Sequence, residues 1–382
     1  MEISRESSVK EKVLIVGGGI GGFSSAIGLT QRGFDVEIVE LHKEWKIYHV
    51  GIIVQSNFIR ALATLGVGKE AVDAGYAYRG WRWRNNEDGS ELGRSEGVSS
   101  AGPEFPADLG LARPALHDVL YKRVKELGIS IRQGVTFETV TDNGDSVDVS
   151  FTDGTSGTYD LVIGADGAYS KMRQLLFGDT YKPEFTGQGV WRYNLPRPKD
   201  LEWAEAYITD PSRSIGTVPL TEDTMYIFVT SPEPGNPYFD PSKLAELMKD
   251  RMRGRGAKVE EFMEQITDPD LVVYRPLETC VIPAPWHKGR VVLIGDAVHS
   301  STPHLGQGAA MAVEDAVVLS DELDKDAPIE ERLTAFAERR YHRAKFIADS
   351  SALLGEWQMN PTPDADPMGL YERVRLFIGE EI

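Results

Sequence analysis

The sequence feature that most constrains the fold is GGGIGG, Gly17 to Gly22. It follows Lys12 to Val16 (KVLIV), a short apolar run that predicts a strand buried on both faces. The segment after the glycines, up to Arg32, carries apolar residues at helical spacing, and Asp35 to Glu40 (DVEIVE) predicts a second strand. Strand, helix and strand in this short a stretch form a right-handed βαβ unit with parallel strands.

The glycine spacing in this unit predicts a dinucleotide site. Gly17 permits a tight turn, Gly19 lets backbone amides approach a pyrophosphate, and Gly22 allows close helix–strand packing. The N-terminus of the helix adds the positive end of its dipole. Glu40, eighteen positions after Gly22, can accept hydrogen bonds from ribose hydroxyls. NAD and FAD are not distinguished at this step. The predicted cofactor contacts are Gly17, Gly19, Ile20, Gly21, Gly22 and Glu40.

Two later segments also place polar groups directly after apolar strands. In DLVIGADGAYSKMR, Asp166 can cap the following helix and Gly167 can let the chain pass close to a cofactor, although a plain strand–turn–helix junction explains the pattern equally well. In GRVVLIGDAVHSSTPHLGQG, Asp296 is placed to bind sugar hydroxyls. The amides of Gly306, Gln307 and Gly308 suit an anionic or electron-rich ring edge at the start of a long helix.

The middle of the chain changes character. Turn signals at Asp142–Gly144 and Asp153–Gly154 predict hairpins, and residues 185–229 are rich in strand patterns. Two helical stretches follow near residues 242–253 and 259–266, and a further long helix is expected at about 329–357. The expected layout is an α/β nucleotide domain interrupted by a mostly antiparallel sheet domain.

The three motifs, in this order and spacing, resemble the single-component FAD-dependent aromatic hydroxylases related to para-hydroxybenzoate hydroxylase, over roughly Val13 to Leu323. The resemblance implies an α/β fold. It consists of a Rossmann-like FAD-binding domain with an inserted, mostly antiparallel β-sheet substrate domain and a C-terminal helix. The expected FAD domain comprises residues 1–75, 100–180 and 283–330, the substrate domain 76–99 and 181–282, and the C-terminal helical segment 331–382.

The resemblance also assigns roles to residues. Asp166 and Gly167 match a motif near the pyrophosphate that is linked to NAD(P)H use, and Asp296 matches the residue that holds the ribityl chain of FAD. Arg113 matches an arginine near the flavin, and Pro303 matches a proline whose backbone lies over it. The activity implied is hydroxylation of a small aromatic or heteroaromatic, phenol-like ring. NADH or NADPH reduces FAD, and O₂ forms a C4a-hydroperoxide whose distal oxygen attacks the ring.

Candidate substrate residues lie in the strand-rich middle. Arg192 and Tyr193 fall on opposite strand faces, so at most one is expected to face a pocket. The spacing of Tyr226 after Pro219 resembles the flavin-dependent urate hydroxylases, where the matching tyrosine contacts substrate, and Arg213 is a candidate cation nearby. A solvated or packed sheet residue is an equal alternative for each. The candidate substrate residues are Arg192, Arg213 and Tyr226, and the candidate catalytic residues are Tyr226, Pro303 and His49.

His49 precedes a loop that lies near the flavin in relatives, but the position of their histidine base matches Ile53 here, so the role of His49 stays open. The competing functions are an FAD enzyme without hydroxylation, such as a reductase, dehydrogenase or halogenase, and a non-catalytic flavin-binding sensor. Trp81 and Trp83 in RGWRWRN predict a half-buried hairpin. The absence of a following Ile-Pro counts against a halogenase.

Composition excludes other classes. The 41 Lys and Arg against 59 Asp and Glu give a net charge of −18, which argues against nucleic-acid binding. No apolar run is long enough to span a membrane, and the polar first twelve residues lack the apolar core of a signal peptide. The lone Cys280 gives neither a disulfide nor a metal cluster, and packing is its expected role. We therefore expect a soluble, cytoplasmic monomer or homodimer without a metal.

Overall fold

The computed structural model describes residues 10–208 and 214–382. A six-stranded sheet carries the glycine motif, in the order β18-β19-β12-β1-β2-β8. All neighbours in it are parallel except β18 and β19. Its strands are β1 (Lys12–Val16), β2 (Asp35–Glu40), β8 (Ser130–Gln133), β12 (Leu161–Gly164), β18 (His287–Lys288) and β19 (Val291–Leu293).

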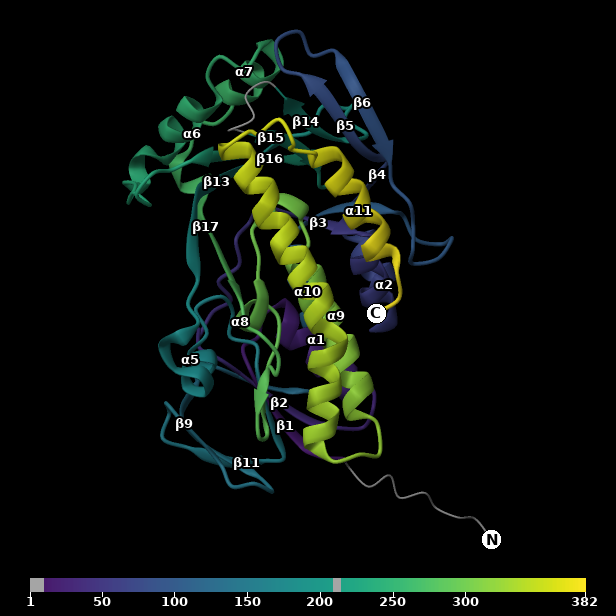
Figure 1. Ribbon diagram of the computed structural model, residues 1–382, viewed down its shortest axis with the longest axis vertical. Helices are drawn as coiled ribbons and strands as arrows, with labels where there is room; N and C mark the ends of the chain where they lie inside the picture. Colours follow the sequence, from purple (N-terminus) through teal and green to yellow (C-terminus); the bar gives the residue numbers. More distant parts are fainter. Residues whose placement is uncertain (1–9, 209–213) are drawn as a thin grey trace.

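Helices cover this sheet. Helix α1 (Ile20–Thr30) packs against α9 (Gly308–Leu323) and α4 (Arg113–Glu126), and α9 also packs against α2 (Ser56–Thr64). Nearly every residue of α9 is buried, because α10 (Ile329–Met359) covers its other side. Figure 1 shows α10 running along the length of the molecule beside α9. The long C-terminal helix therefore caps the nucleotide domain.

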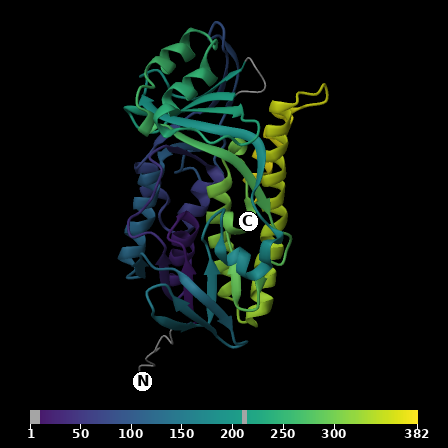
Figure 2. The same cartoon turned by 90° about the vertical axis from the view of Figure 1, so that its left-hand side faces the viewer.

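A seven-stranded sheet forms the other end of the molecule. Its order is β17-β13-β16-β15-β14-β5-β6, and every pair is antiparallel except β14 and β5. Helices α6 (Leu244–Met252) and α7 (Ala257–Glu264) cover its outer face (Figure 2). The strands are β5 (Gly80–Asn85), β6 (Glu91–Glu96), β13 (Glu184–Pro196), β14 (Ala204–Ile208), β15 (Ser214–Pro219), β16 (Thr224–Pro232) and β17 (Val273–Val281).

Two three-stranded sheets complete the strand structure. The first joins β9 (Phe137–Asp142), β10 (Val147–Phe151) and β11 (Ser156–Tyr159) through the two predicted hairpin turns. The second has the order β3-β7-β4, from β3 (Gly51–Gln55), β7 (Asp108–Ala112) and β4 (Tyr76–Tyr78). Short helices are α3 (Gly68–Asp73), α5 (Lys171–Phe177) and α8 (Asp296–His299).

A buried ionic network joins α9 to α10. Arg340 donates from Nη1 to Glu314 Oε2 and from Nε to Asp315 Oδ1, both at 2.8 Å, and Arg343 donates from Nε to Glu314 Oε2 at 2.7 Å. The second oxygen of Asp315 accepts from His299 Nε2 at 2.6 Å and from the Gly295 amide at 2.9 Å. Burial would raise the pKa of Asp315, but the charges of His299 and Arg340 lower it to about 2. The network therefore fixes the backbone immediately before Asp296.

The predicted βαβ unit, the hairpins and the antiparallel sheet are confirmed, and Cys280 is buried in the core as expected. Helix α11 (Pro367–Gly379) was not predicted from the sequence; it follows the acidic, proline-rich loop and packs against α10 and α2. The predicted domain boundaries stay a prediction. In the part of the chain that is described, no helix is long and apolar enough to cross a membrane.

Candidate active site

The three sequence motifs meet at one edge of the six-stranded sheet. They follow the carboxyl ends of β1, β12 and β19, which are adjacent parallel strands. Ligands of open α/β sheets bind at this edge, because the loops and helix N-termini converge there. The topology therefore brings together residues that are more than 100 positions apart in the chain.

The glycine loop has a separate task for each glycine. Gly17 has a φ of +112°, and a Cβ there would lie 2.3 Å from the carbonyl oxygen of Ala165. A Cβ on Gly22 would lie 2.0 Å from the Gly17 oxygen, so these two positions exclude any side chain. A Cβ on Gly19 would meet nothing within 4 Å. Gly19 thus faces free space at the uncapped N-terminus of α1, which suits the close approach of a pyrophosphate.

The two acids of the loop region are engaged with backbone. Glu40 accepts from the Gly18 amide through Oε2 and from the His42 amide through Oε1, both at 2.9 Å. Ser170 is the N-cap residue of α5 and accepts from the Arg173 amide, and Asp166 helps to cap the helix by accepting from Ser170 Oγ and from the Met172 amide. The helix-capping interpretation of Asp166 is therefore confirmed. A ribose contact by Glu40 stays a prediction.

An inner cavity of about 390 Å³ lies in front of the sheet edge. Gly167 forms part of its wall; its φ is +79°, and a Cβ there would meet no atom within 4 Å. The predicted cofactor residues that line the cavity are Ile20, Gly21, Arg113, Asp296, Gly306 and Gly308, and the catalytic candidate Pro303 lines it as well. Arg275 and Glu278 of β17 also line it, and they were missed in the sequence because no local motif marks them.

Asp296 presents its carboxylate to the inner cavity. Among the described residues it makes no hydrogen bond, and much of its surface is free because it faces this space. Burial in the protein raises its pKa, while His299 and Arg113 oppose that change. A polar ligand that donates hydrogen bonds would satisfy this carboxylate. The sugar-like hydroxyls of a flavin cofactor fit that requirement.

The side chain of Gln307 points away from the inner cavity. Its Oε1 accepts from Asn57 Nδ2 at 2.9 Å, and its Nε2 donates to Gln55 Oε1. Gln55 in turn donates to the carbonyl of Leu305 at 3.1 Å. These amides hold the loop from Pro303 to Gly306, so any cofactor contact at Gln307 would come from its backbone.

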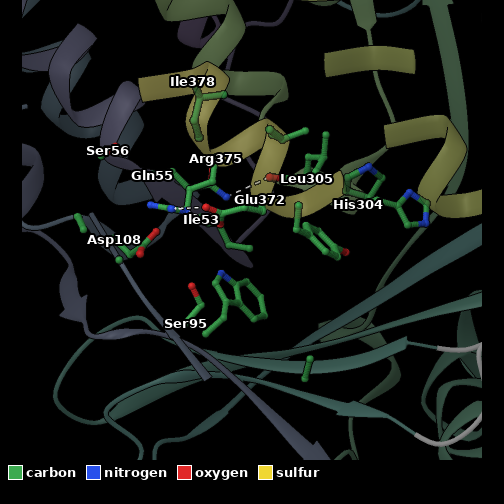
Figure 3. Close-up of a pocket in the computed structure, with 18 of the residues that line it drawn as sticks. Ile53, Gln55, Ser56, Ser95, Asp108, His304, Leu305, Glu372, Arg375 and Ile378 are labelled. Atoms are coloured by element: carbon green, nitrogen blue, oxygen red, sulfur yellow. Dashed lines mark hydrogen bonds and ion pairs between the residues drawn. The ribbon is translucent and has the colours of Figure 1, made fainter. Parts of the chain in front are cut away.

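An outer cavity of about 430 Å³ lies between the seven-stranded sheet and α11 (Figure 3). Apolar side chains from both sides line it, including Trp81, Phe228 and Ile378. Several polar residues that no sequence motif marks also line it: Gln55, Ser56, Ser95, Asp108 and Tyr371. His304, which lies in the motif that carries Asp296, lines it too. The inner and outer cavities share a wall made of Ile53, Val190, Arg192, Tyr226, Pro303 and Gly306.

Arg192 and Tyr226 stand in the shared wall on neighbouring strands. Cross-strand pairing places Arg192 opposite Phe228 and Tyr226 opposite Asn194, so all four share one face of the sheet. Burial raises the pKa of Tyr226 to about 12, although Arg192 and Arg113 oppose the change. Burial and Arg113 lower the pKa of Arg192 to about 10. At neutral pH the wall therefore holds a neutral phenol beside a guanidinium cation.

Three other candidates have different surroundings. Tyr193 faces away from the cavities and packs in the core beneath α6, so only Arg192 of that pair faces a pocket. His49 lines neither cavity, and its Nε2 lies 3.0 Å from the carbonyl of Leu271. Arg213 lies outside the described residues. Among the residues described, no group of three His, Cys, Asp or Glu could hold a metal ion.

The sheet edge, the glycine loop and the inner cavity define an α/β flavoprotein with a second cavity beside the cofactor site. The chain belongs to the FAD binding domain family, which matches residues 10–351. It is an FAD-dependent monooxygenase, because the relatives that it matches over nearly their whole length are monooxygenases and hydroxylases.

Two relatives and one solved structure illustrate the match. The chain is 33% identical over 393 residues to 2-heptyl-3-hydroxy-4(1H)-quinolone synthase of Pseudomonas aeruginosa, covering 96% of this chain and 98% of the relative. It is 32% identical over 353 residues to the aurachin C monooxygenase/isomerase of Stigmatella aurantiaca, covering 91% and 90%. Klebsiella pneumoniae HpxO, solved with FAD and uric acid, superposes with a TM-score of 0.83 at 25% identity, covering 97% and 93%.

Proposed function

We propose that this monooxygenase uses NADH or NADPH and O₂ to hydroxylate a small aromatic or heteroaromatic, phenol-like substrate in the outer cavity. The observation that carries the proposal is the shared wall. A ring held against Arg192 and Tyr226 from the outer side would adjoin the inner cavity, because both residues line both cavities. Oxygen transfer requires that contact, because the reacting atoms must approach to about 3–3.5 Å.

The overall reaction converts the substrate ring, O₂, NAD(P)H and one proton into the hydroxylated ring, NAD(P)⁺ and water. FAD, when bound, accepts the hydride and activates O₂ for transfer to the ring. Because the ring is attacked by an electrophile, the protein accelerates the step when it raises the electron density of the ring.

The residues of this chain bind, orient and shield. Asp296 and Arg113 would hold the polar chain of the cofactor, and Gly19 would let its pyrophosphate approach the α1 amides. The Arg192 cation can stabilise negative charge on a ring oxygen, and the neutral Tyr226 phenol can donate a hydrogen bond. Trp81, Phe228 and the residues of α11 exclude water from the reacting ring.

The outer cavity favours a ring that carries an apolar extension. From the shared wall it continues along Trp81, Trp83 and Val98 on one side and Leu376 and Ile378 of α11 on the other. One relative is named for a quinolone with a heptyl chain, and a solved neighbour holds uric acid, another nitrogen heterocycle. We therefore place bicyclic nitrogen heterocycles, with or without an alkyl chain, first among the substrates to test.

The test is oxidation of NADH and of NADPH, each with and without a panel of phenols, hydroxybenzoates, quinolones and purines. We expect one class of ring to stimulate oxidation, and ¹⁸O from ¹⁸O₂ to appear in the product. A simple reductase would oxidise the nicotinamide at the same rate without a ring. Failure of every ring class to stimulate oxidation or to gain ¹⁸O would contradict the proposed function.

A further inference from the structure

The outer cavity contains a buried carboxylate for which the cofactor site provides no use. Asp108 is the first residue of β7 and is 8% exposed. Among the described residues, no side chain or backbone group donates a hydrogen bond to its carboxylate. Carboxylates buried to this degree are ordinarily paired or hydrogen-bonded, because an unpaired buried charge is costly. Asp108 therefore lacks a partner among these residues.

The sheet register directs this carboxylate into the cavity. Asp108 lies opposite Gln55 on β3 and opposite Tyr78 on β4, so the three side chains share one face of the small sheet. Figure 3 shows the carboxylate directed at the space beside Gln55 and Ser95. The backbone of Gly97 covers the other side of the Asp108 carboxylate. It lies so close that a Cβ on Gly97 would be 2.3 Å from Oδ2 of Asp108.

The polar groups next to Asp108 either form hydrogen bonds with other residues or are themselves without a partner among the described residues. Gln55 donates to Leu305, and Ser56 Oγ lies 3.0 Å from Ser100 Oγ. The buried hydroxyl of Tyr78 has no partner among the described residues. These wall residues therefore do not satisfy Asp108, and the open side of the carboxylate is the cavity itself.

The other charged groups that line the outer cavity do not neutralise Asp108. Glu372 and Arg375 of α11 pair with each other, with Arg375 Nε 2.8 Å from Glu372 Oε2. Glu96 of β6 lies 3.4 Å from Arg79. Arg94 of β6 lies near Glu91 and over Trp203, and Arg192 of β13 stands in the shared wall. Burial alone raises the pKa of Asp108 to about 7.

The distance between Asp108 and the shared wall matches the length of a bicyclic ring. Ile53, which lines both cavities, pairs with Gly110, two residues along β7 from Asp108. Two residues of a strand span about 7 Å. A bicyclic ring that touches Ile53 and Tyr226 at one edge would therefore reach Asp108 at the other.

We infer that Asp108 contacts the substrate, accepting a hydrogen bond and then the proton from an N–H or O–H group of the ring. This inference rests on the proposed function. The proton moves from the ring heteroatom to a carboxylate oxygen, the N–H or O–H bond breaks, and its electron pair stays on the ring. No electrons are exchanged with the protein. The resulting ring anion is more readily attacked by an electrophilic oxygen. The expected substrates are therefore rings that carry an N–H or O–H group on the edge opposite the one that is hydroxylated.

The first arm of the test needs no substrate. Asp108→Asn keeps the shape but removes the titrating charge. Asp145→Asn is the control, since Asp145 is exposed in the β9–β10 turn and lines neither cavity. The folded-state pKa of Asp108 lies above its ordinary value of 3.8. The folded protein therefore holds the proton more tightly, and wild type loses stability relative to D108N as pH rises from about 4 to 7. If the difference in melting temperature between wild type and D108N stays constant from about pH 4 to 7, the inference is wrong.

The second arm uses 4(1H)-quinolone and 1-methyl-4-quinolone as probes on the FAD-loaded proteins. Perturbation of the flavin absorbance gives the two dissociation constants. We expect D108N to weaken binding of the N–H probe about tenfold or more, because its hydrogen bond to a carboxylate becomes a weaker one to a neutral amide oxygen. Binding of the N-methyl probe should be unchanged, because it has no N–H to donate. Asp145→Asn should change neither dissociation constant, and FAD content should match wild type throughout.

The third measurement is the pH profile of substrate-stimulated oxidation. Wild-type activity should rise through a pKa near 7 as the carboxylate becomes a base, and D108N should lack this rise. An equal loss for both probes, or no loss for either, overturns the role of Asp108. Failure of wild type to respond to any ring class overturns the proposed function instead.

Discussion

The guanidinium Nε of Arg340 lies 2.8 Å from Oδ1 of Asp315, and Oδ2 of the same carboxylate accepts the Gly295 amide. One side chain of α10 thus supports the Gly295 backbone that immediately precedes Asp296 and α8. Both groups are fully buried, so the pair depends on its own geometry rather than on solvent. The C-terminal helix is therefore part of the cofactor site as well as its cover.

Arg340→Met should lower the free energy of unfolding by about 3–5 kcal/mol, because it removes the buried cation that pairs with both Glu314 and Asp315. Thermal unfolding followed by circular dichroism measures this loss. Arg253→Met is the control, since Arg253 is exposed and pairs with Asp250 on the surface, where we expect a change below about 1 kcal/mol. Equal melting temperatures for the two variants would contradict the importance of the network.

Gly19→Ala and Gly22→Ala should fail in different ways. Alanine at Gly19 meets no protein atom, so the apoprotein should keep its melting temperature while FAD affinity falls. Alanine at Gly22 would clash with the Gly17 oxygen, so it should lower the free energy of unfolding by roughly 1–3 kcal/mol and also weaken FAD binding. Unfolding of the apoproteins and flavin fluorescence titration separate the two effects. Normal FAD affinity in G19A would refute the placement of the pyrophosphate.

Asp296→Ala should purify largely colourless. The carboxylate makes no hydrogen bond among the described residues, so its removal should leave the apoprotein at least as stable as wild type. The ratio of the flavin absorbance in the visible region to the protein absorbance in the ultraviolet reports FAD content. Asp145→Ala, an exposed acid in the β9–β10 turn, is the control and should stay yellow. A fully loaded D296A protein would contradict the assignment.

Arg192→Met should raise the KM for a hydroxybenzoate about tenfold or more, because a charged hydrogen bond is lost. The KM for the corresponding neutral phenol should change little. Wild type should prefer the anion throughout the neutral and mildly alkaline range, because the Arg192 guanidinium stays charged there. Steady-state oxidation with both ligands tests this, and a uniform rise in both KM values would exclude charge recognition by Arg192.

Leu376→Trp should change substrate size preference without affecting the fold. Leu376 is 60% exposed yet lines the outer cavity, so the larger side chain narrows the cavity at its α11 side. We expect poorer turnover of a ring with a long alkyl chain than of the same ring with a methyl group. The melting temperature should be nearly unchanged, as for most surface substitutions. If turnover by the variant does not depend on alkyl chain length, the alkyl chain of the substrate does not lie along α11.

Local patterns were sufficient to predict the nucleotide domain. Glycine spacing, apolar strands and the residues that end them identified the loop at Gly17 and the position of Asp296, because each depends on a few neighbouring residues. Asp108 and Arg275 could not be found this way, since each begins or lies within an ordinary strand and gains its environment from distant segments. Helix α11 was missed, although Leu370, Val374 and Ile378 recur at helical spacing, because their burial depends on distant segments such as α10 and α2.

Strands β1, β12 and β19 are neighbours in the sheet, yet β1 ends at Val16 and β19 begins at Val291. The cofactor site is consequently absent until most of the chain has been synthesised and β19 has joined the sheet. A ligand that binds only the assembled edge stabilises every segment that contributes to it. The yellow colour of the protein should thus act as a gauge of complete folding. Flavin supply during expression should determine yield even for variants whose mutations lie far from the cofactor.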